Sequence, residues 1–338
     1  MQPTAPIADS SPSTSVSGNR YILPFVLVAF LFFLWGMVHN LDGILIPHLK
    51  KAFQLSNTES MLIDSAIFTA YFLMAIPAGM ILKRWGYKNG IIAGLILAGI
   101  GASLFIPAAN TTTYVLFLLA LFIVGCGITI LETAANPYAA ILGSPETAST
   151  RLNLGAAVNG LAVFIAPLLG SRFIFSGIEY SDEQLAAMTD TQQTAYLSME
   201  ASRVNTTYIF IALGFLIVAV LFFLFKLPEA KDTTKTVKLS QFSAVLKHRH
   251  LKWAVIAQFF YVGAQVCVTS VFVRMAMKYA GVDEVSAGNK LGYLYGSLFL
   301  GGRFIGTILT RYFSSSRLLL FFSIGASVFS LIAITGSG

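Results

Sequence analysis

The chain is poor in charged residues and nearly free of cysteine. Only 11% of its 338 residues are charged, whereas roughly 25% are charged in a typical soluble domain. Cys126 and Cys267 lie far apart in apolar segments, so we expect packing residues, with neither a disulfide nor a metal site. The sequence contains no phosphate-binding loop of the G-x-x-x-x-G-K-S/T type and no metal-ligand spacing of His, Cys and Glu. These absences argue against an ATP-driven pump or an enzyme, and we expect no cofactor and no metal.

Apolar residues are abundant instead. They make up 56% of the chain, and the mean hydropathy is +0.75. This composition is typical of a polytopic membrane protein, for which the lipid bilayer is the surrounding partner. A net charge of +7 would suggest nucleic-acid binding in a soluble protein. Here the basic residues are explained by membrane topology, and we expect no nucleic-acid partner.

Nine apolar segments are long enough to cross a bilayer as helices. We therefore predict an all-α polytopic membrane protein. Ahead of the first segment, residues 1–20 are rich in Ser, Thr and Pro, and we expect them to form a disordered tail. The predicted spans are 21–48, 59–82, 87–108, 113–142, 152–176, 205–227, 251–279, 286–310 and 317–336.

The distribution of lysine and arginine predicts the orientation of these spans, because cytoplasmic loops carry more basic residues. The loop 83–88 and the middle segment 226–252 are basic, whereas the segment 177–204 is acidic. We therefore place the N-terminus and the middle segment in the cytoplasm and 177–204 outside. Lys50 and Lys51 contradict this rule, because they follow the first span and would lie outside.

An internal repeat relates the second and eighth spans. Residues 79–84 (GMILKR) end the second span, and residues 306–311 (GTILTR) end the eighth. The alternative is two unrelated helix ends, since packing glycines and cytoplasmic arginines are both common. A true repeat predicts two copies of a six-helix unit joined by a basic cytoplasmic linker, with Arg84 and Arg311 at a cytoplasmic gate.

An acidic residue, Glu132, follows a long apolar run inside the fourth span. An ionisable group in a span costs roughly 3 kcal/mol on insertion scales, so it usually faces protein or water and marks a substrate or proton path. Asn136 lies one turn further on the same helix face. Pro137 removes a backbone donor and frees a carbonyl near Thr133. The alternative is a carboxylate near a helix end that reaches the membrane interface.

Five segments of the chain carry a family resemblance: FFLWGMVHNLDGILIPHLKKAF (32–53), YFLMAIPAGMILKRWGYKNGIIAGL (71–95), LETAANPY (131–138), RLNLGAAVNG (151–160) and AQFFYVGAQ (257–265). They resemble the major facilitator superfamily, and in detail its proton-linked L-fucose and glucose/galactose symporters. The resemblance implies two six-helix halves around a site at mid-membrane, and sugar:proton symport by alternating access.

The resemblance also predicts how the chain is divided. The N-terminal half is expected at 21–227, a cytoplasmic linker at 228–250, and three helices of the second half at 251–338. Because the family has twelve helices, we expect the last three helices of the second half to be missing from this chain.

The resemblance links Glu132 to proton and sugar coupling, and it makes Asp42 the second candidate for proton coupling. The fucose transporters carry their first-helix aspartate where this chain has Gly43. Asp42 is therefore turned by about 100° around the helix relative to that position. The alternative for Asp42 is a carboxylate near the external interface beside His39.

The resemblance further implies a polar sugar site formed by several spans. In the segment 257–265 two amides and a phenol recur at i, i+3 and i+7, on one helix face. That face would be costly against lipid, and helix packing or helix–helix hydrogen bonding is the alternative to sugar binding. Ala156 and Thr269 replace a glutamine and a tryptophan of the fucose transporters, which argues for another sugar or a broader hexose range. The predicted sugar-binding residues are Trp35, Asn40, Asn136, Asn159, Gln258, Tyr261 and Gln265.

These observations predict a secondary transporter of a hexose or deoxyhexose with a proton. We expect a monomer in the inner membrane of a bacterium, with a cytoplasmic N-terminus. One alternative is a sodium-coupled sugar carrier, because carboxylate and amide oxygens also bind sodium. Another is a membrane scaffold or sensor that has the fold without transport. Glu132 and the polar face of 257–265 argue against a scaffold, which gains nothing from their insertion cost.

Overall fold

The computed structural model describes residues 21–144, 147–178, 180–225, 227–228, 248–309 and 312–335. Within these ranges the regular elements are helices, as the long apolar segments predict. The predicted tail, most of the predicted linker and Arg311 lie outside the described residues.

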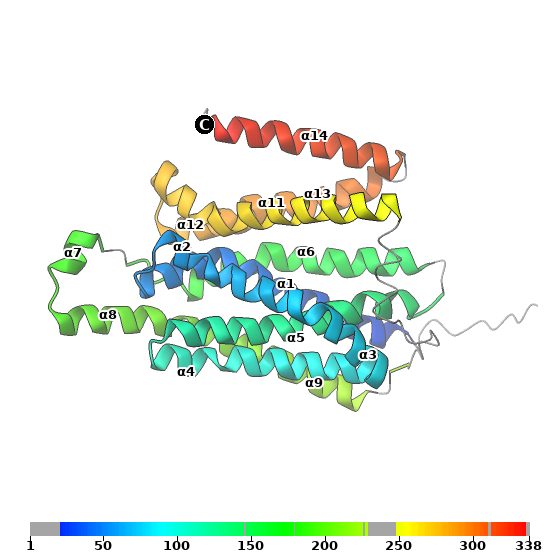
Figure 1. Cartoon of the computed structure of the whole chain (residues 1–338), viewed down its shortest axis with the longest axis horizontal. Helices are drawn as coiled ribbons and strands as arrows, with labels where there is room; N and C mark the ends of the chain where they lie inside the picture. The colour runs from blue at the N-terminus through cyan, green and yellow to red at the C-terminus, as the bar shows by residue number, and fades with distance from the viewer. Residues whose placement is uncertain are drawn as a thin grey trace, which may run out of the picture.

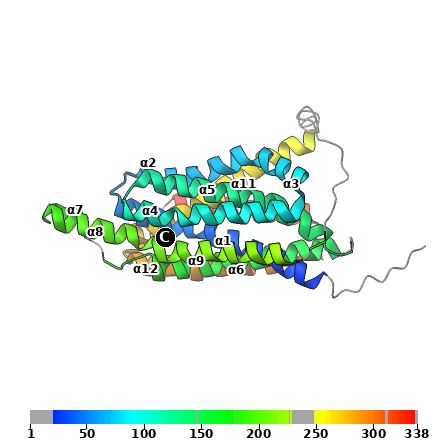
Figure 2. The ribbon, with the colours of Figure 1, turned by 90° about the horizontal axis from the view of Figure 1, so that it is seen from below.

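The first part of the chain forms a bundle of long helices that run side by side along the longest axis (Figure 1). The short helices α2, α7 and α8 lie toward one end, where α7 and α8 project beyond the bundle (Figures 1 and 2). The helices are α1 (Ile22–Ala52), α2 (Asn57–Ser60), α3 (Leu62–Ser103), α4 (Phe105–Asn110), α5 (Tyr114–Ile141), α6 (Ala148–Phe173), α7 (Asp182–Ala186), α8 (Asp190–Ser202) and α9 (Val204–Leu224).

The later helices pack on this bundle through α1 and α6. Figure 1 shows α14 at the outer edge, with α11 and α13 between it and α6. These elements are α11 (Arg249–Ala280), α12 (Glu284–Lys290), the π-helix η3 (Leu291–Gly296), α13 (Ser297–Leu309) and α14 (Ser315–Ile334).

Two of the predicted spans lie in α3, which reverses direction at Gly86. There φ is 80° and ψ is 168°, a combination that is essentially restricted to glycine. A Cβ atom on Gly90 would lie only 3.7 Å from the Cα atom of Leu82, although the two residues are separated by more than two helical turns in sequence. α3 is therefore a helical hairpin, in agreement with the predicted spans 59–82 and 87–108.

Seven helices of the described chain are long and apolar enough to cross a membrane. One of them, 57–110, contains the α3 hairpin and so accounts for two predicted spans. Another begins at Asp190 and includes the predicted span 205–227. The predicted span 286–310 is interrupted by η3 and is not among the seven. The total of nine spans therefore stays a prediction.

Small residues bring α3 and α5 into backbone contact. A Cβ atom on Gly127 would lie 2.5 Å from the backbone nitrogen of Ala98, and one on Gly94 would lie 3.0 Å from the carbonyl oxygen of Gly127. Glycine at these positions lets the two helices approach closely, which is how membrane helices gain packing energy in the absence of a hydrophobic driving force. This contact fixes α5 against α3 just ahead of Glu132.

Candidate functional site

Glu132 lies in the interior of α5, well before its last residue, Ile141. A third of its side chain is exposed (32%), whereas Leu131 and Ala135 beside it are buried. Tyr71 of α3 lies beside Glu132, and its hydroxyl group interacts electrostatically with the Glu132 carboxyl group. The carboxyl group therefore contacts a second helix within the bundle, a position that a carboxylate reaching the interface from a helix end would not take.

His39 and Tyr71 extend this contact to a third helix. The Nε2 atom of His39, on α1, lies 2.7 Å from the Tyr71 hydroxyl oxygen and 3.9 Å from Oε1 of Glu132. The rings of His39 and Phe68 are 6.5 Å apart, so α3 also covers the imidazole. A hydroxyl group can donate one hydrogen bond and accept another. His39, Tyr71 and Glu132 thus form one connected chain from three helices, which we call the His39–Glu132 chain.

Neither Tyr71 nor His39 is among the residues that the sequence predicts for the site. Tyr71 does begin one of the family-like segments, 71–95, but a tyrosine in a span is most often a packing residue. Its contact with Glu132 depends on the α3–α5 packing and is not visible in the spacing of residues along the chain.

Asn136 satisfies the helix backbone one turn after Glu132. Its Nδ2 atom donates to the carbonyl oxygen of Glu132 at 3.2 Å, and its side chain is exposed. Pro137 follows and has no backbone N–H to donate to the carbonyl group of Thr133. The predicted grouping of a carboxyl, an amide and a freed carbonyl therefore lies on one stretch of α5, with the amide nitrogen bonded to the backbone.

Asp42 and Gly43 face different neighbours. Asp42 is buried (6% exposed), and its charge interacts with those of Asp64 on α3 and Tyr208 on α9. Its Oδ1 atom has no hydrogen-bond partner among the described residues. A Cβ atom on Gly43, in contrast, would lie 3.0 Å from the backbone oxygen of Thr269 on α11. The offset of one residue therefore turns Asp42 toward the first bundle, whereas position 43 faces the later helices.

Asp64 joins α3 to α11. Its side chain is hydrogen bonded to Ser270 and lies in the field of Arg274. Arg274 Nη1 in turn donates to Ser60 Oγ at 3.3 Å. These contacts connect the first bundle to the later helices near α2.

Three of the predicted sugar-binding residues make contacts within the first bundle. Trp35 is 6% exposed, and its ring centroid lies 4.4 Å from that of Phe32. Asn40 Nδ2 donates to the carbonyl oxygen of Gly36 at 2.7 Å. Asn159 Nδ2, on α6, donates to the carbonyl oxygen of Phe32 at 3.0 Å. In this conformation these side chains pack α1 and join it to α6.

The predicted polar face of α11 approaches other polar groups of the later helices. Gln265 is hydrogen bonded to Tyr295 of η3, and Tyr261 and Tyr295 both interact electrostatically with Arg303 of α13. Gln258 is exposed. Tyr295 and Arg303 are not among the predicted sugar-binding residues.

Two contacts join these later helices to the first bundle. Gln265 lies one turn before Thr269, the residue whose backbone oxygen approaches Gly43 of α1. Arg303 Nη1 donates to the carbonyl oxygen of Ala156 on α6 at 3.4 Å. The backbone of Thr269 and the side chain of Arg303 therefore contact the first bundle, whereas Gln258 and Tyr261 are exposed.

The alignment of the whole chain decides its family. Residues 23–338 match the sequence profile of the Major Facilitator Superfamily. The chain belongs to this superfamily. Among curated relatives, a glucose/galactose transporter of Brucella abortus is 38% identical over 100% of this chain and 79% of its own length. An L-fucose-proton symporter of Escherichia coli is 40% identical over 95% of this chain and 74% of its own length.

A solved structure of the same superfamily has the same fold. The transporter FucP in its outward conformation matches with a TM-score of 0.72 and 40% identity, over 92% of this chain and 77% of its own. The predicted major facilitator fold is thereby confirmed, and the chain is a multi-pass membrane protein of this superfamily.

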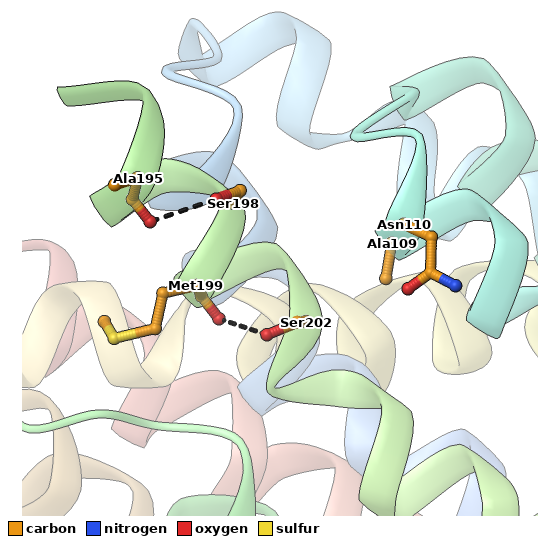
Figure 3. A pocket seen from close by; sticks show the side chains of 6 residues that line it. All are labelled: Ala109, Asn110, Ala195, Ser198, Met199 and Ser202. Atoms are coloured by element: carbon orange, nitrogen blue, oxygen red, sulfur yellow. Dashed lines mark hydrogen bonds between the residues drawn. The ribbon is translucent and has the colours of Figure 1, made fainter. Parts of the chain in front are cut away.

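One hollow of this major facilitator protein lies apart from the polar groups described above. It is lined by Ala109, Asn110, Ala195, Ser198, Met199 and Ser202 (Figure 3). The hydroxyl groups of Ser198 and Ser202 donate to carbonyl oxygens of their own helix, and no lining residue is charged. We assign no substrate to it. Among the described residues, no group of three or more His, Cys, Asp or Glu could hold a metal ion.

Arg84 is exposed at the turn of the α3 hairpin, two residues before Gly86. Its predicted partner at a cytoplasmic gate, Arg311, lies outside the described residues. The gate therefore stays a prediction.

Proposed function

We propose that this protein carries a hexose or deoxyhexose across the membrane together with a proton, by alternating access. The observation that carries this proposal is the His39–Glu132 chain, which places a carboxyl group among membrane-spanning helices with two polar partners. Relatives with 38% and 40% identity are a glucose/galactose transporter and an L-fucose-proton symporter, which supports a sugar as substrate and a proton as coupling ion.

A carboxyl group couples the two movements because it can be neutral or charged. The charged form is disfavoured inside a membrane bundle, so a carrier that has bound sugar while Glu132 is ionised reorients poorly. Protonation of Glu132 removes this cost. Binding of the sugar beside the protonated group then allows the two halves to rock around a site at mid-membrane.

We assign sugar binding to polar side chains on both sides of the bundle. Asn136 supplies an amide next to Glu132, and Gln258, Tyr261 and Gln265 supply two amides and a phenol on one face of α11. Trp35 and Asn40 on α1 and Asn159 on α6 are the remaining proposed sugar-binding residues. When sugar binds, these side chains have to replace their present contacts within the helices by contacts with the sugar. Asp42 is proposed as a second acid, acting through the neighbouring Asp64.

We infer the remaining properties from topology. The basic loops place the N-terminus in the cytoplasm and 177–204 outside. The carrier is proposed to work as a monomer in a bacterial inner membrane, with Arg84 and Arg311 at its cytoplasmic gate.

Uptake by proteoliposomes tests this proposal. The purified chain is reconstituted, and entry of labelled glucose, galactose and L-fucose is measured in sodium-free buffer under an inward proton gradient, with and without a protonophore. We expect at least one sugar to accumulate, and the protonophore to abolish accumulation. Accumulation that needs sodium and ignores the protonophore would contradict proton coupling. Absence of sugar entry or exchange from well-reconstituted protein would favour a scaffold.

A further inference from the structure

We propose that Tyr71 and His39 are the relay through which the coupling proton reaches Glu132. The proposal rests on the proposed proton coupling and adds its route. The His39 Nε2 atom is 2.7 Å from the Tyr71 hydroxyl oxygen, and that hydroxyl group lies beside the Glu132 carboxyl group, with which it interacts electrostatically. Direct transfer from His39 to Glu132 is longer, since Nε2 and Oε1 are 3.9 Å apart, which exceeds hydrogen-bond distance.

The relay has two states that differ by one proton. In the first, the Glu132 carboxylate accepts from Tyr71 O–H, and the Tyr71 oxygen accepts from His39 Nε2–H. When a proton is added to His39 Nδ1, the Nε2 proton passes to the Tyr71 oxygen, and the original Tyr71 proton passes to Glu132. The products are a neutral carboxyl group, an intact tyrosine and a neutral His39 protonated at Nδ1. The Tyr71 oxygen gains one proton from His39 as it gives one to Glu132, so tyrosine carries no net charge after the transfer.

The imidazole is placed to exchange protons with water. A quarter of the His39 side chain is exposed (25%), whereas a buried ring would have no proton source. The titratable groups that His39 contacts are Tyr71 on α3 and Glu132 on α5. Asp42 on its own helix interacts electrostatically with Tyr71, and Asp64 on α3 interacts with Asp42. A histidine can gain or lose a proton on either ring nitrogen, as the entry point of the relay requires.

Removal of the Tyr71 hydroxyl group tests the relay. Tyr71→Phe and His39→Gln are compared with the parent in proteoliposomes, using sugar exchange at equal concentrations, proton-driven accumulation, and proton uptake on sugar addition. We expect both variants to keep exchange within about twofold, because exchange of loaded carrier needs no proton transfer. The initial rate of proton-driven accumulation should fall by at least about tenfold, as loss of a proton-transfer group typically costs more than that. Tyr114→Phe is the matched control, because its hydroxyl group donates to the carbonyl oxygen of Glu59 on α2 at 2.7 Å, away from the relay.

Each result has one interpretation. Parental accumulation rates in both variants would overturn the relay while leaving proton symport intact. Loss of exchange in both variants, with an unchanged melting temperature, would also overturn it, since the groups would then serve sugar binding. Absence of proton uptake by the parent would instead contradict the proposed function itself.

A second cluster, at the end of the bundle that carries α7 and α8, supports an independent inference. Lys51 Nζ lies 2.8 Å and 2.9 Å from the two carboxylate oxygens of Glu284 on α12 and 3.4 Å from Oε1 of Glu200 on α8. The side chains of Glu200 and Glu284 are 0% and 4% exposed. We call these three residues the Lys51 cluster. It contains one of the two lysines that contradict the positive-inside distribution.

The two carboxylates of the Lys51 cluster differ in their attachment. Glu200 belongs to the first bundle, where Ser176 donates to it and His48 Nδ1 lies 3.7 Å from its Oε2. Glu284 begins the later helix α12 and contacts the first bundle through Lys51 and the Gly177 amide, 3.2 Å away. If the later helices move away at this end, Lys51 loses Glu284 but keeps Glu200. Glu200 thus stays compensated, which avoids the large cost of an unpaired buried charge.

We infer that the Lys51–Glu284 pair is a clamp that holds this end of the carrier closed and opens once in each transport cycle. This inference depends on alternating access but not on which sugar or ion is carried. An ion pair that is present in only one of two conformations stabilises that conformation, and so it can shift the equilibrium between them without changing the substrate site.

Spin-label distances test the clamp. Labels are placed by Thr58→Cys and Ala280→Cys, both exposed at this end, in a background with Cys126 and Cys267 replaced by alanine. In Glu284→Gln we expect the ratio of long to short distances to rise by about fivefold or more, a typical coupling between conformations. Glu183→Gln, an exposed acid on α7, should leave the ratio unchanged. An unchanged ratio in a Glu284→Gln protein that melts like the parent would overturn the clamp. If that variant fails to fold, Glu284→Asp, which keeps the charge and shortens its reach, must raise the ratio for the clamp to stand.

Discussion

At the scale of single residues, one position along α1 decides which helices an acid can reach. Asp42 interacts with Asp64 and Tyr208 in the first bundle, whereas Gly43 faces Thr269 and Leu291 of the later helices. A helix turns by about 100° per residue, so neighbouring residues cannot share a face. Roles carried over from a relative therefore hold only at the matching position, and here the acid stands one position away.

Gln265 gives a residue-scale prediction about sugar binding. Gln265→Ala removes an amide from the polar face of α11 and its hydrogen bond to Tyr295. We expect the equilibrium affinity for the transported sugar to fall about fivefold to tenfold, since a neutral hydrogen bond contributes about 1 kcal/mol. Gln258→Ala should weaken binding in the same direction. Titration of purified variants with sugar measures both, and parental affinities would assign the face to helix packing.

The sequence predicts part of this site. Glu132 stands out because an acid in an apolar span needs a compensating environment. Tyr71 and His39 do not stand out, because their contact with Glu132 depends on how α1, α3 and α5 pack. Trp35 also shows the limit of such reasoning: its aromatic ring suits a sugar, yet in this conformation it packs on Phe32.

At the scale of elements, the reversal of α3 depends on Gly86. Gly86→Ala places a Cβ atom on a backbone with φ of 80° and ψ of 168°, which should cost about 1–3 kcal/mol. We expect a lower melting temperature of the detergent-solubilised protein. Gly79→Ala in the same helix is the control, because a Cβ atom there meets nothing within 4 Å. Equal melting temperatures for the two variants would show that the turn tolerates a side chain.

Arg151 closes the end of α5, and it offers a second test of an element. It is 9% exposed, and its guanidinium group donates to the carbonyl oxygens of Ala139, Ala140 and Ser144. Arg151→Lys cannot reproduce this fork of donors, so we expect a loss of roughly 1.5–3 kcal/mol of stability, as for hydrogen bonds from charged groups. Arg172→Lys, exposed on the same helix, should melt like the parent. A parental melting temperature for Arg151→Lys would contradict this account of the α5 terminus.

Long apolar helices are the elements that sequence predicts best, because length and hydropathy suffice to recognise them. The α3 hairpin lies where the basic loop 83–88 predicts a turn. The interruption of 286–310 by η3 was not predicted, since a π-helix leaves no clear pattern in hydropathy. The helix that contains the predicted span 205–227 begins earlier, at Asp190. Hydropathy does not predict this extension, because α8 is polar and leaves the bundle.

At the scale of the whole molecule, the first bundle and the later helices meet near α2, through Arg274 and Ser60, and at several further places. Gly43 meets Thr269 near the middle of α1, Arg303 reaches Ala156, and Lys51 pairs with Glu284 at one end. A carrier that works by alternating access has to exchange such contacts in every cycle. Among these contacts only Lys51–Glu284 is an ion pair, and so it is the one expected to report on opening most directly.

The central claim is that Glu132 couples the proton to the sugar, and Glu132→Gln tests it most directly. Glutamine keeps the size and hydrogen-bonding capacity of the side chain but cannot release a proton, so the variant resembles a permanently protonated carrier. Sugar exchange and proton-driven accumulation are measured in the same vesicles. For Glu132→Gln we predict sugar exchange near the parental rate and loss of accumulation. Glu132→Ala also removes the partner of Tyr71, so we expect it to lose accumulation and to show slower exchange. If Glu132→Gln concentrates sugar as well as the parent, Glu132 is not the coupling acid.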